Sequence, residues 1–427
     1  MRLTRGLVLK LVVAASLLGG AACLGVLGGN SAGGRAWAQS DAARRSASPP
    51  RALWEGLDPR RAELAGDQLV VDLPSGSRAQ LTLDPGLQQH LQRELERFEV
   101  PYASVVAIEP ATGRVLAYVS HSSANPDAPD LALDPTPPTA SVFKIITAAA
   151  LVDAGVGPEA QVCYHGGSSR LLADNLEDDP ARDRTCATLA DALGGSLNAV
   201  FAKLADRHLD TATLDRYAAA FGFGHALPFD LPTRPSPGEV PERSTDRLEF
   251  ARTSAGFWHM HMSPLHAALI AATFANEGRM PRAAIVERVV DPSGRTVYEH
   301  VPEVFRAVIS RGTARTVGHM MELTVTQGTA RRSFHDRQGR PFLPDIRVAG
   351  KTGTLSGSDP YRGYTWWVGF APVERPTIAV AALVVNTPQW RIKASYAARE
   401  ALRYYLVERP ARAAGAAEPP PDPSPEQ

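Results

Sequence analysis

The chain has 427 residues, 44% of them hydrophobic, and its 45 basic side chains are balanced by 45 acidic ones. This length and apolar content allow a sizeable buried core and exclude a chain that is disordered throughout. Because there is no excess of positive charge to neutralise phosphates, the composition gives no electrostatic case for a nucleic-acid partner and fits a sugar or peptide substrate better.

The first 40 residues carry the pattern of an export signal. Basic residues at the start are followed by an apolar run over residues 11–29 and by small residues at Ala36-Trp37-Ala38. A positive flank, an apolar core and an A-x-A site are typical of a secretory signal peptide. The run is also about as long as the 17–25 residues that span a bilayer, so residues 1–40 are either a signal peptide or a membrane anchor. We expect an exported, periplasmic protein, and the pattern leaves open whether it is anchored in the inner membrane.

A polar stretch with clusters of arginine and proline follows the export signal. We expect residues 41–80 to be a linker with a short N-terminal segment of alternating apolar residues around Leu69. Apolar spacing then predicts a helix over residues 84–98. Two β-rich runs over 104–108 and 114–119 predict a hairpin, because a turn with proline and glycine separates them.

The stretch Ser141-Val142-Phe143-Lys144 joins a Pro-rich segment to an apolar helix over residues 145–152. A serine and a lysine three residues apart lie on one face of a helix, so the amine can reach the hydroxyl. Such a lysine acts as a base only if desolvation or a neighbouring cation keeps it neutral part of the time. The chain carries its positive charge almost wholly as arginine, which cannot give up its proton, so its few lysines are candidates for proton chemistry. They are Lys10, Lys144, Lys203, Lys351 and Lys393.

Residues 161–188 are predicted to form an irregular excursion that contains Cys163 and Cys186. These two cysteines lack zinc-type spacing, so in an exported protein we expect them to form a disulfide. We interpret the charged run over residues 174–184 as a solvated loop, and Lys203, on the helix that follows, as a surface residue.

The rest of the chain alternates helices and strands. Ser196-Leu197-Asn198 lies between a helical turn over 188–193 and a helix over 199–207, and the Pro-rich residues 225–247 are predicted to form a surface loop. Further helices are predicted over 265–276, 310–326 and 395–407, and further strands over 285–290, 296–298, 347–353, 364–370 and 377–385. Strands at both ends with helices between them predict an α/β (α+β) fold. We expect an antiparallel sheet flanked by helices, with an inserted, mostly helical subdomain.

Three short patterns follow one another along the chain: Ser141-x-x-Lys144, Ser196-x-Asn198 and Lys351-Thr352-Gly353. An S-x-x-K, S-D-N and K-T-G trio occurs in penicillin-binding proteins and class A β-lactamases. Matching flanks over 105–117, 327–330 and 366–372 extend the likeness. From about residue 81 to about residue 407 the chain therefore resembles the transpeptidase domain of a penicillin-binding protein. The resemblance implies a β-lactamase/transpeptidase-like fold.

The resemblance also implies a reaction. The chain would be a penicillin-binding D,D-transpeptidase that cross-links peptidoglycan stem peptides through a serine acyl-enzyme, and β-lactams would acylate the same serine. Ser141 would be the nucleophile, Lys144 the base that takes its proton, and Ser196 the relay that hands a proton to the leaving group.

A second set of residues would bind the substrate. By resemblance, Asn198 would hold the substrate amide, while Lys351 and Thr352 would receive the terminal carboxylate. Gly353 carries no side chain, so the substrate can lie against that strand as an extra edge strand. The backbone amides of the nucleophile and of Thr354 would stabilise the tetrahedral intermediate.

Two other classes of function remain open. A D,D-carboxypeptidase or a serine β-lactamase uses the same motifs with water as the acceptor, and it needs a base that activates this water. Glu239, Glu242 and Glu249 lie in or near the Pro-rich loop and are the candidates for that base. A non-catalytic β-lactam sensor or scaffold would be acylated without turnover. A sensor is disfavoured because fewer than ten residues precede the first apolar stretch, which leaves no room for a signalling domain.

The expected organisation has four segments: 1–40 as signal peptide or membrane anchor, 41–80 as linker and short N-terminal segment, 81–410 as the transpeptidase domain, and 411–427 as a disordered Pro-rich tail. No cofactor is expected, and no metal, because the His259-x-His261 pair has no evident third ligand nearby. The bifunctional relatives carry a glycosyltransferase domain, for which residues 1–80 have no room. We therefore expect a separate glycan polymerase as a partner.

Overall fold

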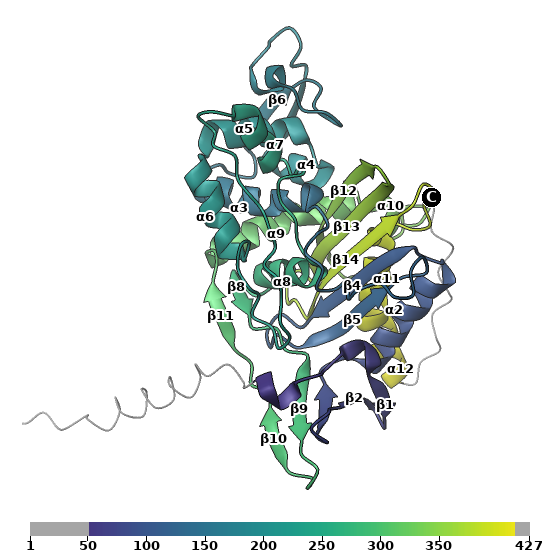
Figure 1. Cartoon of the computed structure of the whole chain (residues 1–427). Helices are drawn as coiled ribbons and strands as arrows, with labels where there is room; N and C mark the ends of the chain where they lie inside the picture. Colours follow the sequence, from purple (N-terminus) through teal and green to yellow (C-terminus); the bar gives the residue numbers. More distant parts are fainter. Residues whose placement is uncertain (1–50, 415–427) are drawn as a thin grey trace, which may run out of the picture. The chain divides into compact units, whose positions relative to one another are not determined.

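The structure is a computed structural model that describes residues 51–414, and it is built around a five-stranded antiparallel sheet of order β12-β13-β14-β4-β5 (Figure 1). The strands are β4 (Tyr102–Ile108), β5 (Val115–His121), β12 (Ala349–Ser358), β13 (Tyr361–Ala371) and β14 (Ile378–Asn386). Because β14 pairs with β4, segments from the two ends of the domain meet in the middle of one sheet. This confirms the α+β fold predicted from the order of the elements.

The central sheet is covered on both faces, and its strands alternate between two cores. On β4, Val106 and Ile108 face one core, while Val105 and Ala107 face the other. Helix α8 (Pro264–Ala275), all of whose residues are buried, covers the first face. Helices α2 (Pro85–Arg97) and α11 (Ala394–Arg403) cover the second face. A strand buried on both sides has no polar face, which explains why all of β14 is apolar up to its last residue.

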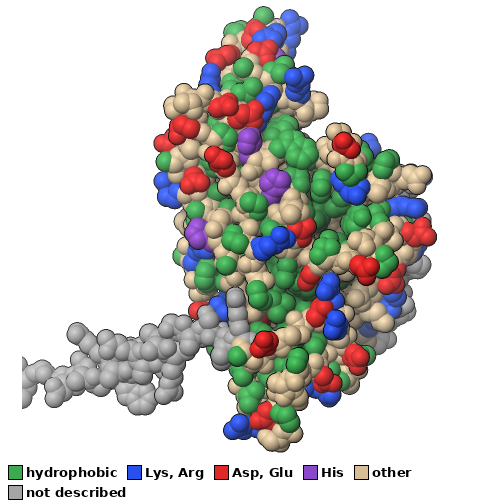
Figure 2. All heavy atoms as spheres, in the orientation of Figure 1, with side chains coloured by type: hydrophobic (Ala, Val, Ile, Leu, Met, Phe, Trp, Pro, Cys, Tyr) green, Lys and Arg blue, Asp and Glu red, His purple; other side chains and the backbone are tan. Residues whose placement is uncertain are grey.

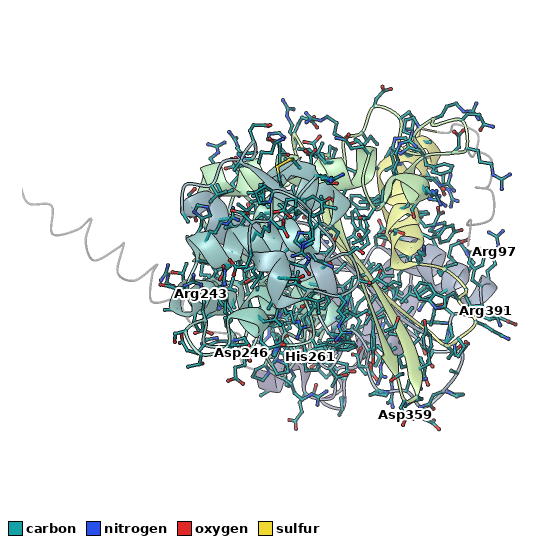
Figure 3. All side chains as sticks on the ribbon, turned by 90° about the horizontal axis from the view of Figure 1, so that it is seen from above. Arg97, Arg243, Asp246, His261, Asp359 and Arg391 are labelled. Carbon is teal, nitrogen blue, oxygen red and sulfur yellow. A yellow bond between two sulfur atoms is a disulfide. The ribbon has the colours of Figure 1, made fainter. Side chains whose placement is uncertain are left out.

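A helical lobe lies beside β12, the edge strand of this sheet (Figure 1). Its helices are α3 (Lys144–Asp153), α4 (Leu189–Gly195), α5 (Asn198–His208), α6 (Thr211–Phe221), α7 (Arg247–Ser254) and α9 (Arg311–Thr326). Helix α9 packs against both α4 and β12 and so connects the lobe to the sheet. Seen from above, the hairpin of β12 and β13 extends away from the lobe to Asp359 in its turn (Figure 3).

Part of the segment that we expected to be a linker belongs to a second, five-stranded sheet of order β1-β2-β3-β9-β10. Its strands are β1 (Glu63–Ala65), β2 (Gln68–Asp72), β3 (Arg78–Leu81), β9 (Val286–Val290) and β10 (Thr296–Glu299). The short segment expected around Leu69 is strand β2, but the linker expected on either side of it is interrupted by strands β1 and β3. These strands are only three to five residues long, and β3 pairs with β9 about two hundred residues later, which a local pattern does not reveal.

Short elements complete the described chain. They are η1 (Arg51–Trp54), η2 (Pro59–Arg61), η3 (Ala140–Phe143), β6 (Gln161–Tyr164), η4 (Ala173–Leu176), β7 (Thr185–Thr188), β8 (Arg279–Pro281), β11 (Val304–Ala307), α10 (Arg331–Phe334), η5 (Tyr404–Glu408) and α12 (Arg409–Ala413). Because α12 continues to Ala413, the expected tail does not begin at residue 411. The rest of that tail, from residue 415, and the expected export signal lie outside the described residues.

No helix within residues 51–414 is both long enough and apolar enough to cross a membrane. On the face shown in Figure 2, acidic and basic side chains are interspersed, with no large area of one sign. This distribution agrees with the balanced charge of the sequence.

The excursion at the tip of the lobe is closed by a disulfide between Cys163 and Cys186, which face each other across the β6–β7 hairpin. The two cysteines are separated by 23 positions along the chain. A bond that closes a loop of this size stabilises a fold by about 3 kcal/mol in the chain-entropy model.

Lys203 lies beneath this excursion and is fully buried, so its interpretation as a surface residue is wrong. Its Nζ donates to Asp183 Oδ2 at 2.6 Å, to Asp178 at 3.3 Å and to the carbonyl of Cys163 at 3.1 Å. His165 Nδ1 contacts the other carboxylate oxygen of Asp183 at 2.5 Å. The charged run over 174–184 is therefore not simply a solvated loop, because two of its carboxylates, Asp178 and Asp183, pair with a buried lysine.

The charge of Asp183 depends on these contacts. Burial raises the pKa of its carboxyl group, but the hydrogen bonds from Lys203 and His165 outweigh burial and leave the pKa well below its ordinary value. The Asp183 side chain is only 5% exposed. Removing the lysine would therefore leave a largely buried carboxylate without its cation.

We expect Lys203→Met to lower the free energy of unfolding by about 3 kcal/mol, because breaking a buried pair leaves an uncompensated charge. Urea unfolding measures this change. Lys203→Met combined with Asp183→Asn should recover part of the loss. The matched control is Arg234→Gln, which removes an exposed pair with Asp134 and should cost less than about 1 kcal/mol. Equal losses in the two single variants would contradict the structural role of Lys203.

Candidate active site

Ser141 lies in the 3-10 turn η3, which leads directly into α3. Its neighbours Val142 and Phe143 are buried and anchor the turn in the core. Behind the turn, Gly256 has φ +83°, and a Cβ on it would lie 2.2 Å from the carbonyl oxygen of Ala140. Only glycine allows this backbone to approach so closely, so the segment after α7 supports the serine from behind.

Lys144, one turn after the serine, is fully buried. Its Nζ lies 2.9 Å from Ser141 Oγ, 2.6 Å from Asn198 Oδ1 and 2.6 Å from the carbonyl oxygen of Ala255. Burial, and then the nearby ammonium of Lys351, hold the pKa of Lys144 well below its usual value.

These three contacts match a neutral amine. A neutral amine has two N–H donors and one lone pair, and the oxygens of Asn198 and Ala255 can only accept. If they take the two N–H groups, the lone pair is left facing the hydroxyl of Ser141. The geometry therefore suits transfer of the serine proton to the lysine.

Ser196 and Asn198 lie in the connection between α4 and α5. Ser196 has φ 57°, the left-handed conformation that ends α4, and Asn198 begins α5. The amide of Asn198 is oriented by contacts on both sides, because its Oδ1 accepts from Lys144 and its Nδ2 donates to the carbonyl of Ser168 at 2.7 Å. Ser168 belongs to the excursion that the disulfide closes.

Lys351 reaches the same site from β12 and is also fully buried. Its Nζ donates to Ser196 Oγ and to the carbonyl of Thr352, both at 2.9 Å. Burial lowers the pKa of Lys351 to about 7. Two lysines, each next to a serine, therefore face each other across the interface between lobe and sheet.

A glycine is needed at position 353 for a different reason from the one expected. A Cβ on this residue would lie 3.1 Å from Ala140 Cβ and 3.2 Å from Val142 Cγ2. The missing side chain therefore lets β12 pack closely against the nucleophile turn. Room for a substrate comes instead from the position of β12 as an edge strand, whose outer side has no neighbouring strand in this sheet.

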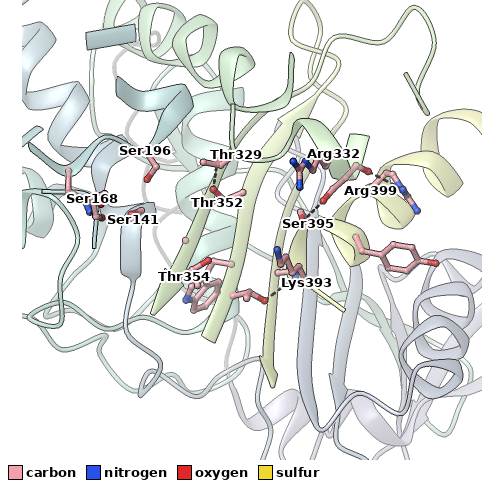
Figure 4. A pocket seen from close by; sticks show the side chains of 17 residues that line it. Ser141, Ser168, Ser196, Thr329, Arg332, Thr352, Thr354, Lys393, Ser395 and Arg399 are labelled. Atoms are coloured by element: carbon pink, nitrogen blue, oxygen red, sulfur yellow. Dashed lines mark hydrogen bonds between the residues drawn. The ribbon is translucent and has the colours of Figure 1, made fainter. Parts of the chain in front are cut away.

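A cleft of about 370 Å³ opens above these groups (Figure 4). Of the sequence-predicted site residues, it is lined by Ser141, Ser196, Asn198, Thr352, Gly353 and Thr354. Lys144 and Lys351 are buried and do not line it, so they can be reached only through the serines and backbone groups that cover them. The structure thus brings the seven named residues of the three motifs, and Thr354, to one place.

The cleft also contains residues to which the sequence analysis gave no role. The hydroxyl of Thr329, which follows α9, lies 2.5 Å from that of Thr352. Arg332, Ser333, Lys393, Ser395, Tyr396 and Arg399 line the far part of the cleft. Lysine scarcity had marked Lys393 as a candidate for chemistry. The roles of the Ala255 and Ser168 carbonyl groups could not be predicted from the sequence, because any residue type can provide a backbone oxygen.

The side chains of His259 and His261 contact different partners. His259 Nε2 contacts Glu249 at 2.7 Å, whereas His261 Nδ1 contacts the carbonyl of Thr136 at 2.7 Å. Within residues 51–414 no group of three or more His, Cys, Asp or Glu side chains is arranged to hold a metal ion.

Comparisons with known proteins agree with this geometry. A family model described as the penicillin-binding protein transpeptidase domain matches residues 103–404. Peptidoglycan D,D-transpeptidase PbpA of Mycolicibacterium smegmatis is 30% identical over 348 residues, which cover 73% of this chain and 68% of that protein. PbpA of Mycobacterium tuberculosis H37Rv is 29% identical over 352 residues, with the same two shares.

Solved structures show the same likeness. The crystal structure of PBPA from Mycobacterium tuberculosis matches with a TM-score of 0.64 and 26% identity, over 78% of this chain and 83% of that one. A ceftriaxone acyl-enzyme complex of penicillin-binding protein A from the same organism matches with a TM-score of 0.62 and 26% identity, over 78% and 81%. The match of the family model over most of the folded chain, together with these relatives, shows that the chain belongs to the penicillin-binding protein transpeptidase family.

Proposed function

We propose that this chain is a peptidoglycan D,D-transpeptidase in which Ser141 is the nucleophile and Lys144 is the general base. The observation that carries the proposal is the environment of the Lys144 amine. It is buried, its pKa is lowered, and two acceptor oxygens fix its N–H groups so that its lone pair faces Ser141. Acylation of a serine at neutral pH needs such a base.

The first half of the reaction forms an ester. Ser141 Oγ attacks the carbonyl carbon of the terminal D-Ala-D-Ala bond while Lys144 takes the hydroxyl proton. Backbone N–H groups of Ser141 and Thr354 stabilise the oxyanion of the tetrahedral intermediate. As the intermediate collapses, the C–N bond breaks, and the departing D-Ala amine receives a proton through Ser196. This route is supported by the hydrogen bond between Ser196 and Lys351.

The second half regenerates the enzyme. An amine of a second stem peptide attacks the ester carbonyl, the new amide bond forms, and the C–O bond to Ser141 breaks. The amine loses one proton and Ser141 regains one, so the lysines end in their starting states. The products are the cross-linked peptide and free enzyme.

The terminal carboxylate of the donor is assigned to Thr352 and Lys351. Lys351 donates to the backbone carbonyl of Thr352, and its pKa of about 7 leaves it partly charged near neutral pH. An arriving carboxylate favours the charged form of Lys351. A stronger positive charge on Lys351 in turn disfavours a proton on Lys144, so binding of the substrate would prepare the base.

Hydrolysis is less well supported than transfer. Among the 17 residues that line the described cleft, none is an aspartate or glutamate that could activate water. The glutamates of the Pro-rich region are engaged elsewhere: Glu249 with His259 and Arg252, and Glu242 with Ser244. Glu239 does not line the cleft. Without a base that activates water, the acyl-enzyme is hydrolysed slowly and persists until an amine attacks it. This favours a transpeptidase over a D,D-carboxypeptidase or β-lactamase.

The cellular context is a further part of the proposal. Peptidoglycan lies outside the cytoplasmic membrane, and residues 1–40 have the pattern of an export signal, so we place the chain in the periplasm, anchored or free. Cross-linking requires glycan strands that already exist. Because residues 103–404 match a transpeptidase domain, the partner that we propose to supply these strands is a glycan polymerase.

The first test is labelling with a fluorescent penicillin. Ser141→Ala should abolish the label, because the nucleophile is gone. Lys144→Arg should slow labelling by a hundredfold or more, since arginine keeps a long nitrogen-bearing side chain but stays protonated and cannot act as a base. Ser333→Ala removes another cleft hydroxyl and serves as the matched control, with near-normal labelling expected. A label that survives Ser141→Ala would refute the assignment of the nucleophile.

The second test is the pH dependence of the acylation rate constant. Because the pKa of Lys144 is lowered, the rate should rise with pH on the acid side and reach its plateau well below the ordinary pKa of a lysine. Above about pH 7 the rate should fall, since Lys351 loses the charge that attracts the carboxylate. An acylating agent without a carboxylate should show only the rising part. A rate that keeps rising to pH 10 would mean that Lys144 has an ordinary pKa.

The third test is the lifetime of the acyl-enzyme. Because no carboxylate lines the cleft, we expect benzylpenicillin to form an adduct on Ser141 that lasts minutes or longer, with negligible turnover. Mass spectrometry of the intact protein measures the decay of the adduct. Rapid, repeated hydrolysis that Ser141→Ala abolishes would instead identify a β-lactamase. An intact adduct with no reaction of any peptide donor would favour a non-catalytic sensor or scaffold.

A further inference from the structure

The far part of the cleft carries two cations to which the reaction above gives no role. Arg332 lies on the short helix α10, and Lys393 immediately precedes α11. Both side chains line the same cleft as Ser141 and Thr352. Figure 4 shows the order: Ser141 and Ser196 at one end, Thr329 and Thr352 in the middle, and Arg332, Ser395 and Lys393 at the other end.

Neither cation has a counter-ion in the described part of the chain. No hydrogen bond or ion pair links the guanidinium of Arg332 or the ammonium of Lys393 to any residue within 51–414. The neighbouring Arg399 differs, because it is 3% exposed and donates to Glu400 at 3.0 Å. The cleft thus contains two uncompensated positive charges and no acidic side chain, so it attracts anions.

The reaction indicates which part of the substrate lies there. The acyl group stays on Ser141, and the departing D-Ala places its carboxylate near Thr352. The acceptor amine must attack the same carbonyl from the side that the leaving amine vacates, so the rest of the acceptor extends past Thr352. That direction leads to Arg332 and Lys393.

We propose that Arg332 and Lys393 form a subsite for a free carboxylate on the acyl-acceptor peptide. This proposal rests on the proposed transpeptidase function and adds its substrate preference: an acceptor whose amine-bearing residue carries a carboxylate is selected over the same acceptor with a carboxamide. The two cations supply the charge, and Ser395, which lies between them in Figure 4, supplies a hydroxyl that can donate a further hydrogen bond.

The test measures aminolysis of the acyl-enzyme by matched acceptors. The full-length protein is acylated with a D-Ala-D-Ala peptide donor, and kcat/KM is determined for two amine peptides that differ only in a carboxylate or carboxamide beside the amine. We expect wild-type protein to prefer the carboxylate about tenfold, because hydrogen bonds between charged partners are stronger than neutral ones and solvent screens part of that gain. The preference should fall as sodium chloride is raised.

Variants of the two cations measure how much each contributes to the carboxylate preference. Arg332→Gln and Lys393→Gln should each reduce the preference several-fold, and the double variant should remove it. The preference is a ratio within one variant, so a general loss of folding or activity cancels. Arg331→Gln is the matched control on α10, because Arg331 does not line the cleft. Arg391→Gln is the control near Lys393, since Arg391 pairs with Glu99 and points outward (Figure 3).

The possible results of this experiment distinguish failure of the carboxylate subsite from failure of the transpeptidase function. Aminolysis at equal rates with both acceptors in the wild-type protein would overturn the carboxylate subsite and leave the transpeptidase function intact. A carboxylate preference that persists in the double variant would also overturn it, because the carboxylate would then bind elsewhere. If penicillin labels Ser141 but neither acceptor reacts, the transpeptidase function fails and the subsite fails with it.

Discussion

The buried amine of Lys144 is the contact on which the site depends. Three segments meet at this one nitrogen: its own helix with Ser141, the start of α5 with Asn198, and the end of α7 with the carbonyl of Ala255. A lysine excluded from water is stable only if its donors are satisfied, so these segments must pack correctly before the base exists. Ser141 is therefore activated only when the helical lobe is correctly folded.

The sheet provides the second half of this arrangement. Lys351 comes from the edge strand β12, and its charge lowers the pKa of Lys144 across the interface between sheet and lobe. The interface must be tight for this effect, because charges interact more strongly at short distance and away from water. Glycines provide the tightness: Gly353 lets β12 approach the nucleophile turn, and Gly256 lets the segment after α7 approach it from behind.

The three sequence motifs predicted side chains that the structure brings together, because each motif combines residue types that the proposed chemistry needs at a spacing that a helix or strand fixes. Sequence reasoning also predicted the central sheet, whose strands are long and apolar. It failed for Lys203, since a lone lysine on a helix gives no sign that a loop twenty residues earlier folds over it to supply Asp183. It failed to place β3 in a five-stranded sheet for the same physical reason, because its partner β9 lies about two hundred residues later in the chain.

The charge distribution connects these points. The whole sequence is neutral, yet the described cleft has cations at its floor and at its far end and no acidic side chain. Several cations of the lobe are paired with carboxylates, as Lys203 is with Asp183 and Arg247 with Asp206. Arg332 and Lys393 have no such partner within residues 51–414, so this end of the cleft attracts an anion. Lys351 would bind the carboxylate of the donor, and Arg332 and Lys393 would bind that of the acceptor. The donor carboxylate favours the charged form of Lys351, and this charge keeps Lys144 deprotonated and ready to take the serine proton.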